Sequence, residues 1–399
     1  MSATVQPFRM SFQMKTILGI FIAAGVLCLH LTFQENVSRA WLNVLIGSTL
    51  FLGMGLCGLF FTAIQHLTSA KWSVVLRRIF EAMSLTLPIA AILFFFVFRG
   101  MHHLYEWTHE AAVAHDLLLQ WKAPFLNERA FGIRLIIYFA IWIVAALCLV
   151  LSSLKQDKTG DISITKRNFK KSALILVLFG LSVTMAGFDI LMSIEPHWFS
   201  TMFGVYFFAG FFQAGLAMIM ILAWILYRRG TFQGFVSIDH FHDINRFVFG
   251  FSIFWAYIAF CQFMLIWYAN LPEETFFFYH RMNHGWEWVS FVLLTIRWGI
   301  PFLVLMPFAA KRNFKVTVPI AALIIFGQWL DIFWVTNPAM RLVLGVHEIA
   351  PSIQWKEIAI GLGFVSLFLF IVGFIMERIQ MVPVKDPRLE ASIHYYHHG

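Results

Sequence analysis

Long runs of apolar residues, separated by short polar segments, recur along the whole chain. A helix needs about 20 mostly apolar residues to cross the hydrocarbon core of a bilayer, which is ~30 Å thick. The pattern predicts ten such helices, at residues 15–33, 41–66, 76–98, 131–154, 172–194, 198–226, 245–270, 285–308, 316–336 and 355–376. We therefore predict an all-α polytopic membrane protein.

The composition supports the same class of protein. Hydrophobic residues make up 60% of the chain and charged residues 13%, against roughly 45–50% and 25% in soluble domains. The first apolar run is followed by HLTFQENVSRAW and by no small-residue cleavage site, so we expect it to remain as an anchor. The four cysteines form no CxxC or CxxCH pattern, which gives iron–sulfur clusters and c-type haem no support.

The placement of Lys and Arg predicts the orientation, because short cytoplasmic loops retain these residues. With the N-terminus inside, twenty of the 29 lie in inner segments, eight lie in outer segments and Arg297 lies within a span. We therefore predict a multi-pass membrane protein with both termini in the cytoplasm. The net charge of +8 follows from this topology and does not indicate a nucleic-acid partner.

Two short matches predict an internal repeat. DILMSIEP and DIFWVTNP close the fifth and ninth spans, so Asp189 and Asp331 each precede a proline by seven positions. Arg78 and Ser84 have the same spacing as Arg246 and Ser252. We predict two parallel four-helix bundles, residues 41–196 and 197–338, flanked by residues 1–40 and 339–399. The first unit includes an outer amphipathic loop at residues 99–130.

The charged residues within and beside the spans are the candidates for a proton path or a quinone site. They are Asp189, Glu195, His197, Glu287, Arg297 and Asp331. An ionisable group at this depth usually lines a pathway or pairs with another charge, so bracing of helices and proton transfer both remain open for Asp189. Arg297 lies near the middle of its span and requires an acidic partner. We expect Asp331 first and Asp189 second, because Glu287 lies three turns away on the same helix.

Histidines suggest metal or haem sites that the surrounding sequence disfavours. His102, Glu106 and His109 share a helical face, but the tryptophans around them favour an amphipathic segment at the outer interface, covered by a partner. The tail histidines His394, His397 and His398 favour docking on a neighbour. His30 and His66 fall at opposite membrane sides, so they cannot share a haem. We expect this chain to bind no metal and no redox cofactor of its own, with a diffusible quinone still possible.

Three segments carry a resemblance to a known family: FDILMSIEPHWFSTMFGVYFFAGFF, HHLYEWTHE and PFLNERAFGIRLIIYFAIW. They resemble the ActF subunits, called quinone-binding subunit 2, of bacterial alternative complex III, which are similar to the NrfD and polysulfide-reductase membrane subunits. The likeness runs over nearly the whole chain. It implies a quinol:cytochrome c oxidoreductase with a paralogous membrane subunit (ActC), outer iron–sulfur and multi-haem cytochrome c subunits that hold the cofactors, and in some cases a terminal oxidase.

Two other functions are compatible with ten spans. Secondary transporters also use duplicated helical units, although the sequence shows no clear pair of Gly/Pro-broken spans at mid-membrane. A structural anchor for the outer redox subunits is the third possibility. The acidic residues at the outer side, Asp189, Glu195, Glu287 and Asp331, favour the respiratory subunit over both.

Overall fold

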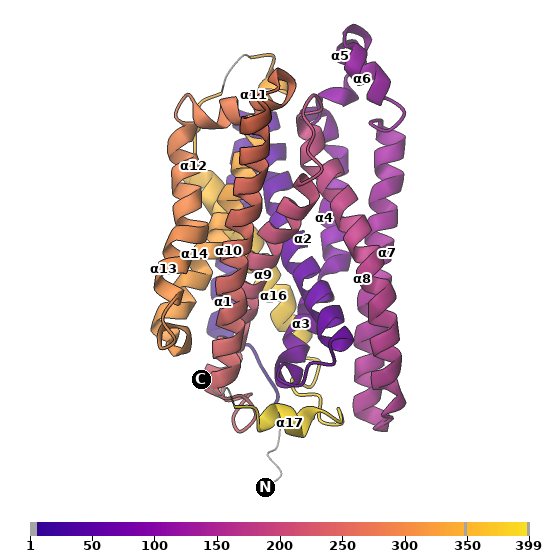
Figure 1. Ribbon diagram of the computed structural model, residues 1–399, viewed down its shortest axis with the longest axis vertical. Coiled ribbons are helices and arrows are strands. Elements are labelled where there is room, and N and C mark those ends of the chain that lie inside the picture. Colours follow the sequence, from indigo (N-terminus) through magenta and orange to yellow (C-terminus); the bar gives the residue numbers. More distant parts are fainter. Residues whose placement is uncertain (1–5, 347–348, 397–399) are drawn as a thin grey trace.

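The fold was analysed in a computed structural model, which describes residues 6–346 and 349–396. These residues form helices joined by turns and loops, and the described ranges contain no strand. The helices stand side by side as one elongated bundle (Figure 1). The predicted class, an all-α polytopic membrane protein, is confirmed.

Ten helical segments in the described ranges are long and apolar enough to cross a membrane. In chain order they are α1 (Phe12–Glu35), α2 (Val37–Leu67), η1–α3–α4 (Val74–Arg99), α7 (Glu128–Thr159), α8–η4 (Ser163–Ile194), α9 (Phe203–Arg228), α10 (Ile238–Ala269), α12–η5–α13 (Trp286–Leu305), α14 (Phe314–Thr336) and α16 (Trp355–Met376). Each of the ten predicted spans therefore exists, although several ends differ.

The ends differ mainly where helices continue past the apolar run. Helix α8 begins at Ser163, nine residues before the predicted start at 172, with Lys166, Arg167, Lys170 and Lys171 in the added turns. Long basic side chains can place their charges in water while the helix continues, so hydropathy alone does not mark a helix end. Helix α9 begins at Phe203 and not at 198, because the segment after Pro196 forms turns.

Two spans are interrupted. The third divides into η1 (Val74–Leu76), α3 (Arg77–Ser84) and α4 (Leu87–Arg99), with a proline in the first turn of α4. The eighth divides into α12 (Trp286–Leu294), the π-helical turn η5 (Thr295–Gly299) and α13 (Ile300–Leu305). Broken spans therefore do occur, but these two do not occupy equivalent places in the predicted repeat and so do not form the matched pair typical of a transporter.

Helices α2 and α9 form the centre of the bundle. Helix α2 packs on α3, α4, α7 and α8, whereas α9 packs on α10 and α14. Where α2 meets α9, glycines allow the backbones to approach closely: a Cβ added to Gly215 would lie 2.1 Å from the Cβ of Cys57. Helices α1 and α16 pair with each other on the outside of α2.

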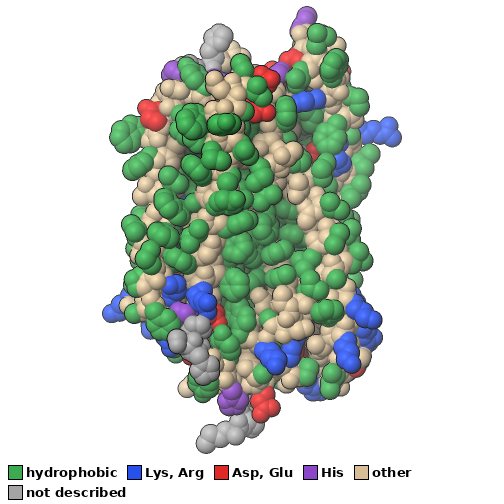
Figure 2. Space-filling model, viewed as in Figure 1, with side chains coloured by type: hydrophobic (Ala, Val, Ile, Leu, Met, Phe, Trp, Pro, Cys, Tyr) green, Lys and Arg blue, Asp and Glu red, His purple; other side chains and the backbone are tan. Residues whose placement is uncertain are grey.

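The two ends of the bundle differ in structure. We call the end that carries residues 6–11 and α17 (Leu389–Ile393) the tail end (Figure 1). The opposite end, the loop end, carries α5 (Glu110–His115), α6 (Leu117–Lys122), α11 (Pro272–Met282) and α15 (Met340–Leu344). Lys and Arg side chains gather near the tail end of the face in Figure 2, as the predicted topology requires.

The loop at residues 99–130 packs partly on its own chain. Tyr105 donates a hydrogen bond to the carbonyl of Ile190 at 2.9 Å, and Trp107 donates one to the carbonyl of Ser193 at 3.1 Å. Both aromatic residues are buried, so they close the loop end of α8. Trp121, by contrast, is 86% exposed.

The described part of the C-terminal tail packs on its own chain, at the tail end, while docking of the tail histidines on a neighbour stays a prediction. Ser392 accepts from the N–H of Val75 at 3.3 Å and donates to the carbonyl of Trp72 at 2.8 Å. Tyr395 donates to Asp243 at 2.6 Å. The tail therefore contacts both predicted four-helix units. His397 and His398 lie outside the described residues.

Candidate functional site: buried ion pairs in a membrane bundle

Arg297 and Asp331 form an ion pair in the interior of the second unit. Arg297 has no exposed surface and Asp331 has 3%. Asp331 also accepts hydrogen bonds from the hydroxyl of Tyr206 and from the indole N–H of Trp255, the latter at 3.3 Å. The acidic partner required by Arg297 is therefore present, and it is the first of the two residues predicted.

The interruption of the eighth span helps to position Arg297. This residue lies in the π turn η5, where the regular backbone pairing is shifted. Gln213 of α9 donates from Nε2 to the carbonyl of Arg297 at 2.8 Å, and its Oε1 accepts from Nε of the same residue at 3.0 Å. The Nε2 of Gln213 also donates to Ser252 at 2.9 Å. One buried amide thus stabilises both the irregular backbone and the charge.

Asp189 forms a second ion pair, with Arg134 of α7. Both carboxylate oxygens accept from the guanidinium at 2.8 Å, and Tyr138 donates a third bond at 2.8 Å. Asp189 is fully buried, whereas the Arg134 side chain is 16% exposed and stacks on Phe125 near the loop end. This pair therefore lies nearer to water than the pair in the second unit.

The two pairs have the same construction. In each case the aspartate precedes a proline by seven residues, and the arginine comes from the preceding span. A tyrosine hydroxyl donates to each aspartate. The duplication itself stays a prediction: the carboxylates and the spans that supply the arginines match, whereas Tyr138 lies on the fourth span and Tyr206 on the sixth, which are not equivalent in the predicted repeat.

The remaining predicted site residues do not join these pairs. Glu195 is buried and ion-paired with Arg281, at 3.2 Å, and with Arg341. His197 bonds Asp116 at 2.5 Å, and both are partly exposed. Glu287 is exposed and accepts from the backbone N–H of Gly285 at 2.9 Å. The four carboxylates expected to act together are thus divided among separate partners, because each buried one is neutralised by its own arginine.

Arg281 explains why Glu195 is buried. Its guanidinium donates to the carbonyls of Trp334, at 3.2 Å, and of Val335, at 2.5 Å, near the end of α14. The last carbonyls of a helix have no partner within the helix, so a cation there is doubly favourable. Glu195 then compensates this buried charge and connects the turn after α8 to α11.

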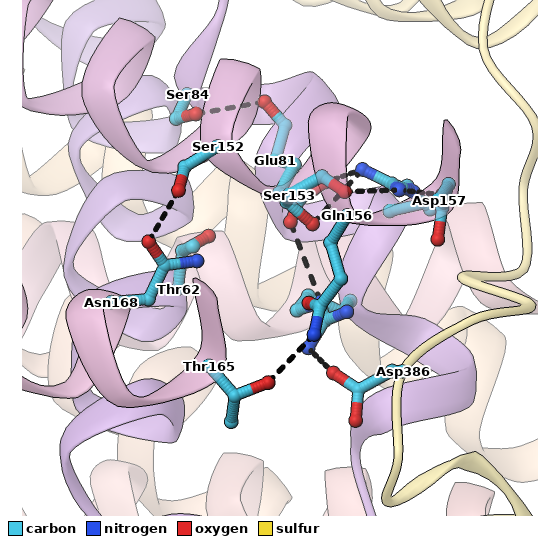
Figure 3. Close-up of polar contacts among 12 residues, drawn as sticks. Thr62, Glu81, Ser84, Ser152, Ser153, Gln156, Asp157, Thr165, Asn168 and Asp386 are labelled. Carbon is cyan, nitrogen blue, oxygen red and sulfur yellow. Dashed lines mark hydrogen bonds and ion pairs between the residues drawn. The ribbon is translucent and has the colours of Figure 1, made fainter. Parts of the chain in front are cut away.

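A fourth charged cluster lies near the tail end of the first unit (Figure 3). Arg78 is fully buried and ion-paired with both Glu81 and Asp157. Arg77 approaches Glu81 at 3.4 Å and binds Asp386 of the tail at 2.6 Å. The pKa of Asp386 lies well below its usual range: burial raises it, but Arg77 and Arg388 outweigh that effect.

This cluster connects the protein surface to the interior. The side chain of Asp157 is 11% exposed, whereas that of Glu81 is fully buried and its Oε1 has no hydrogen-bond partner among the described residues. Figure 3 shows Thr62, Ser84, Ser152 and Asn168 on the neighbouring helices. Charged and hydroxyl groups therefore extend from the tail end into an otherwise apolar unit.

An apolar segment separates this cluster from the Asp189 pair. On α8 the next polar side chains facing the core are Ser172 and Ser182, which are ten residues or about 15 Å apart. Ser182 accepts from the indole of Trp142 at 2.9 Å. Trp142 lies one turn from Tyr138 on α7, and Ser182 lies two turns from Asp189 on α8. The first unit thus contains two polar regions, one open toward each end.

A cavity of about 310 Å³ lies beside the Arg297–Asp331 pair. Aromatic side chains of α9, α10, α11 and α14 line it, together with Gln262, whose Oε1 has no hydrogen-bond partner within the described ranges. Tyr206 forms part of the wall and links the cavity to Asp331. A flat, lipid-soluble ring with a hydroxyl donor, such as a quinol, fits this set of residues.

The histidines of the loop at residues 99–130 form pairwise contacts. His102 lies 3.0 Å from Glu128, and His109 bonds the carbonyl of His102 at 2.8 Å. No group of three or more His, Cys, Asp or Glu residues positioned to hold a metal occurs within residues 6–346 and 349–396. Burial raises the pKa of Glu106 in this loop, although the charge of the nearby His197 opposes that effect.

Sequence reasoning missed several residues of these sites. Glu81 carried a usable signal, because a carboxylate three residues after Arg78 within an apolar span predicts an internal pair. Arg134 and Arg281 counted only as outer basic residues: Arg134 lies at the outer start of the span predicted at 131–154, and Arg281 lies just before the span predicted at 285–308. Gln213 and Asp386 gave no signal, since their partners are distant in sequence.

Comparison with known proteins does not assign the chain to a family. No model of a known protein family matches the chain, and no curated protein matches it. Within residues 6–346 and 349–396 the structure defines an integral membrane protein with ten helices able to span a membrane and with four buried charge clusters.

Proposed function

We propose that this chain is a proton-conducting membrane subunit of a quinol:cytochrome c oxidoreductase of the alternative complex III type, in a bacterial inner membrane. The tail end would face the cytoplasm, since most Lys and Arg residues belong to that side. The paralogous ActC subunit would pack beside it, and the iron–sulfur and multi-haem cytochrome c subunits would cover the loop end. The cofactors would belong to those partners.

The buried Glu81 is the observation that carries this proposal. A carboxylate within a membrane span is costly and usually belongs to an ion or proton pathway. Glu81 has no exposed side-chain surface, yet Asp157 links its cluster to the tail-end surface. A buried ion pair adds little net stability compared with apolar side chains, so bracing alone is a weak reason for five charged groups at this place.

The two polar regions of the first unit suggest how protons would move. Asp157 and Glu81 would take protons from the tail side, and Asp189, with Tyr138 and Arg134, would hand them to the loop side. The apolar segment between Ser172 and Ser182 would block free leakage. Glu195 and His197 lie at the turn that follows Asp189, where released protons would reach water.

The aromatic cavity in the second unit would hold a quinol ring, if this subunit binds one. Quinol supplies two electrons and two protons on oxidation. Tyr206 and Gln262 would orient the ring, and Asp331 would accept the hydrogen bond that the Tyr206 hydroxyl donates.

The test is proton release by the purified complex in sealed vesicles, with a short-chain quinol and cytochrome c. Glu81→Gln and Asp189→Asn keep the size and hydrogen bonding of each side chain, so we expect normal subunit content and haem content but fewer protons released per electron. Asp161→Asn is the matched control, because Asp161 is an exposed carboxylate at the tail end. Normal proton release by both buried variants would reject the proposal and leave a structural anchor.

A further inference from the structure

A cavity of about 430 Å³ opens at the tail end of α10, outside the sites described above. Three segments line it: Trp72 after α2, one face of α10, and Tyr395 of the tail. Along α10 the polar residues Asp243 and Arg246 come first and are followed by Phe247, Gly250 and Phe251. The cavity therefore has a charged mouth and an apolar interior.

The mouth presents two opposite charges side by side. Arg246 Nη1 lies 3.3 Å from Asp243 Oδ1; the side chain of Arg246 is 54% exposed and that of Asp243 is 8% exposed. Asp243 also accepts from the hydroxyl of Tyr395 at 2.6 Å through its other oxygen. Trp72 and Tyr395 flank the charges, and such aromatic residues are typical of the boundary between lipid and water. A simple anion would be attracted by Arg246 but repelled by Asp243. A headgroup with both a phosphate and an ammonium matches both residues.

The apolar part of the cavity lies beside Phe247, Gly250 and Phe251 of α10, and we call it the groove. A Cβ added to Gly250 would meet no described atom within 4 Å, so there is open space beside this residue. Farther along, ring contacts join Phe251 of α10 to Phe212 and Phe208 of α9, and Phe208 to Phe60 of α2. Figure 2 shows hydrophobic side chains over the central part of the face.

We propose that this cavity and groove bind one glycerophospholipid with a primary-amine headgroup, of the phosphatidylethanolamine type, from the leaflet at the tail end. The phosphate contacts Arg246 and the ammonium contacts Asp243, while an acyl chain lies on Gly250 and the phenylalanine floor. A transmembrane helix of a partner subunit could fill the apolar groove, but it offers no paired phosphate and ammonium for the charged mouth.

Native mass spectrometry of the purified, delipidated protein tests this inference, with phosphatidylethanolamine, phosphatidylglycerol and phosphatidylcholine as the probes. We expect one phosphatidylethanolamine to bind about tenfold more tightly than the other two, because each lacks one charge-assisted hydrogen bond. Asp243→Asn should remove the preference over phosphatidylcholine. Arg246→Gln should weaken all three lipids alike.

Gly250→Leu fills the groove and should weaken binding of every phospholipid. Leucine has a higher helix propensity than glycine, so this variant should fold normally. Gly180→Leu is the matched control, since Gly180 of α8 also has open space at its Cβ but does not line the cavity. Equal lipid binding by the two glycine variants, no preference among the three lipids, or crosslinking of residue 250 to a partner protein in the membrane would each overturn the inference.

Discussion

Removing one member of the Arg297–Asp331 pair should destabilise the fold strongly. Asp331→Asn leaves a fully buried guanidinium without its counter-ion, which typically costs about 3–5 kcal/mol. Gln213 Oε1 and the carbonyl of Gly210 still accept from Arg297, at 3.0 and 2.9 Å. We therefore expect the low end of that range, about 3 kcal/mol, or roughly a 100-fold change in the unfolding equilibrium.

The opposite variant should be milder. Arg297→Met leaves Asp331 with two donors, Tyr206 and Trp255. A buried carboxylate can also take up a proton and become neutral, whereas arginine cannot lose one in a protein. The double variant Arg297→Met/Asp331→Asn contains neither charge, so it should be more stable than the single variant Asp331→Asn. The sign of the coupling, and not only the single losses, therefore tests whether the charges compensate each other.

The assay is equilibrium unfolding in mixed detergent micelles, followed by tryptophan fluorescence. Asp189→Asn is a matched control, because its partner Arg134 lies 16% exposed near the loop end and can reach water; we expect a loss of about 1 kcal/mol, as for pairs near the surface. A double variant that loses as much as the two single variants together would refute the reasoning, as would an Asp331→Asn protein of unchanged stability.

Three further predictions concern the tail, the helix contacts and the topology. Folding lowers the pKa of Asp386, so the ionised carboxylate stabilises the docked tail fully above the unfolded pKa of about 3.9. This stabilisation is lost only as the pH falls through the lower folded pKa. Limited proteolysis should therefore find the tail protected from pH 8 to pH 5, and release of the tail near pH 6 would contradict this. Gly215→Ala should lower the thermal unfolding temperature of the protein because its Cβ would overlap Cys57, whereas Gly180→Ala should not. Single cysteines at Ser163 and Glu110 should react with impermeant reagents from opposite sides of oriented vesicles, and labelling from one side would reject the ten-span topology.

The length of the apolar runs predicted the ten spans, because a helix in lipid must satisfy its own backbone hydrogen bonds and must be long enough to cross the bilayer. That constraint is local, so the sequence contains it. The π turn at Arg297 depends on Gln213, which lies 84 positions away, whereas the break before α4 coincides with the local Pro88. Hydropathy alone therefore could not locate the π turn.

The pairing of Arg297 with Asp331 was predictable for a similar reason, because a charge at mid-span requires a partner and few candidates exist. Arg281 was not predictable, since it lies outside the apolar run and is buried only through α11 and the end of α14. The Asp386–Arg77 pair joins residues 309 positions apart. Such contacts follow from the packed fold and leave no pattern in the sequence.

That same pair has a consequence for biogenesis. Chains are made from the N-terminus at roughly 5–20 residues per second, so Arg77 enters the membrane long before Asp386 leaves the ribosome. A nascent chain that has only reached Met376 already has every spanning helix but lacks the carboxylate that binds Arg77. Maturation of the earliest helices therefore waits for the last segment to be translated. A premature stop after the tenth span would yield a bundle in which Arg77 keeps only its 3.4 Å contact with Glu81 and lacks its closer partner, a defect that membrane quality control can recognise.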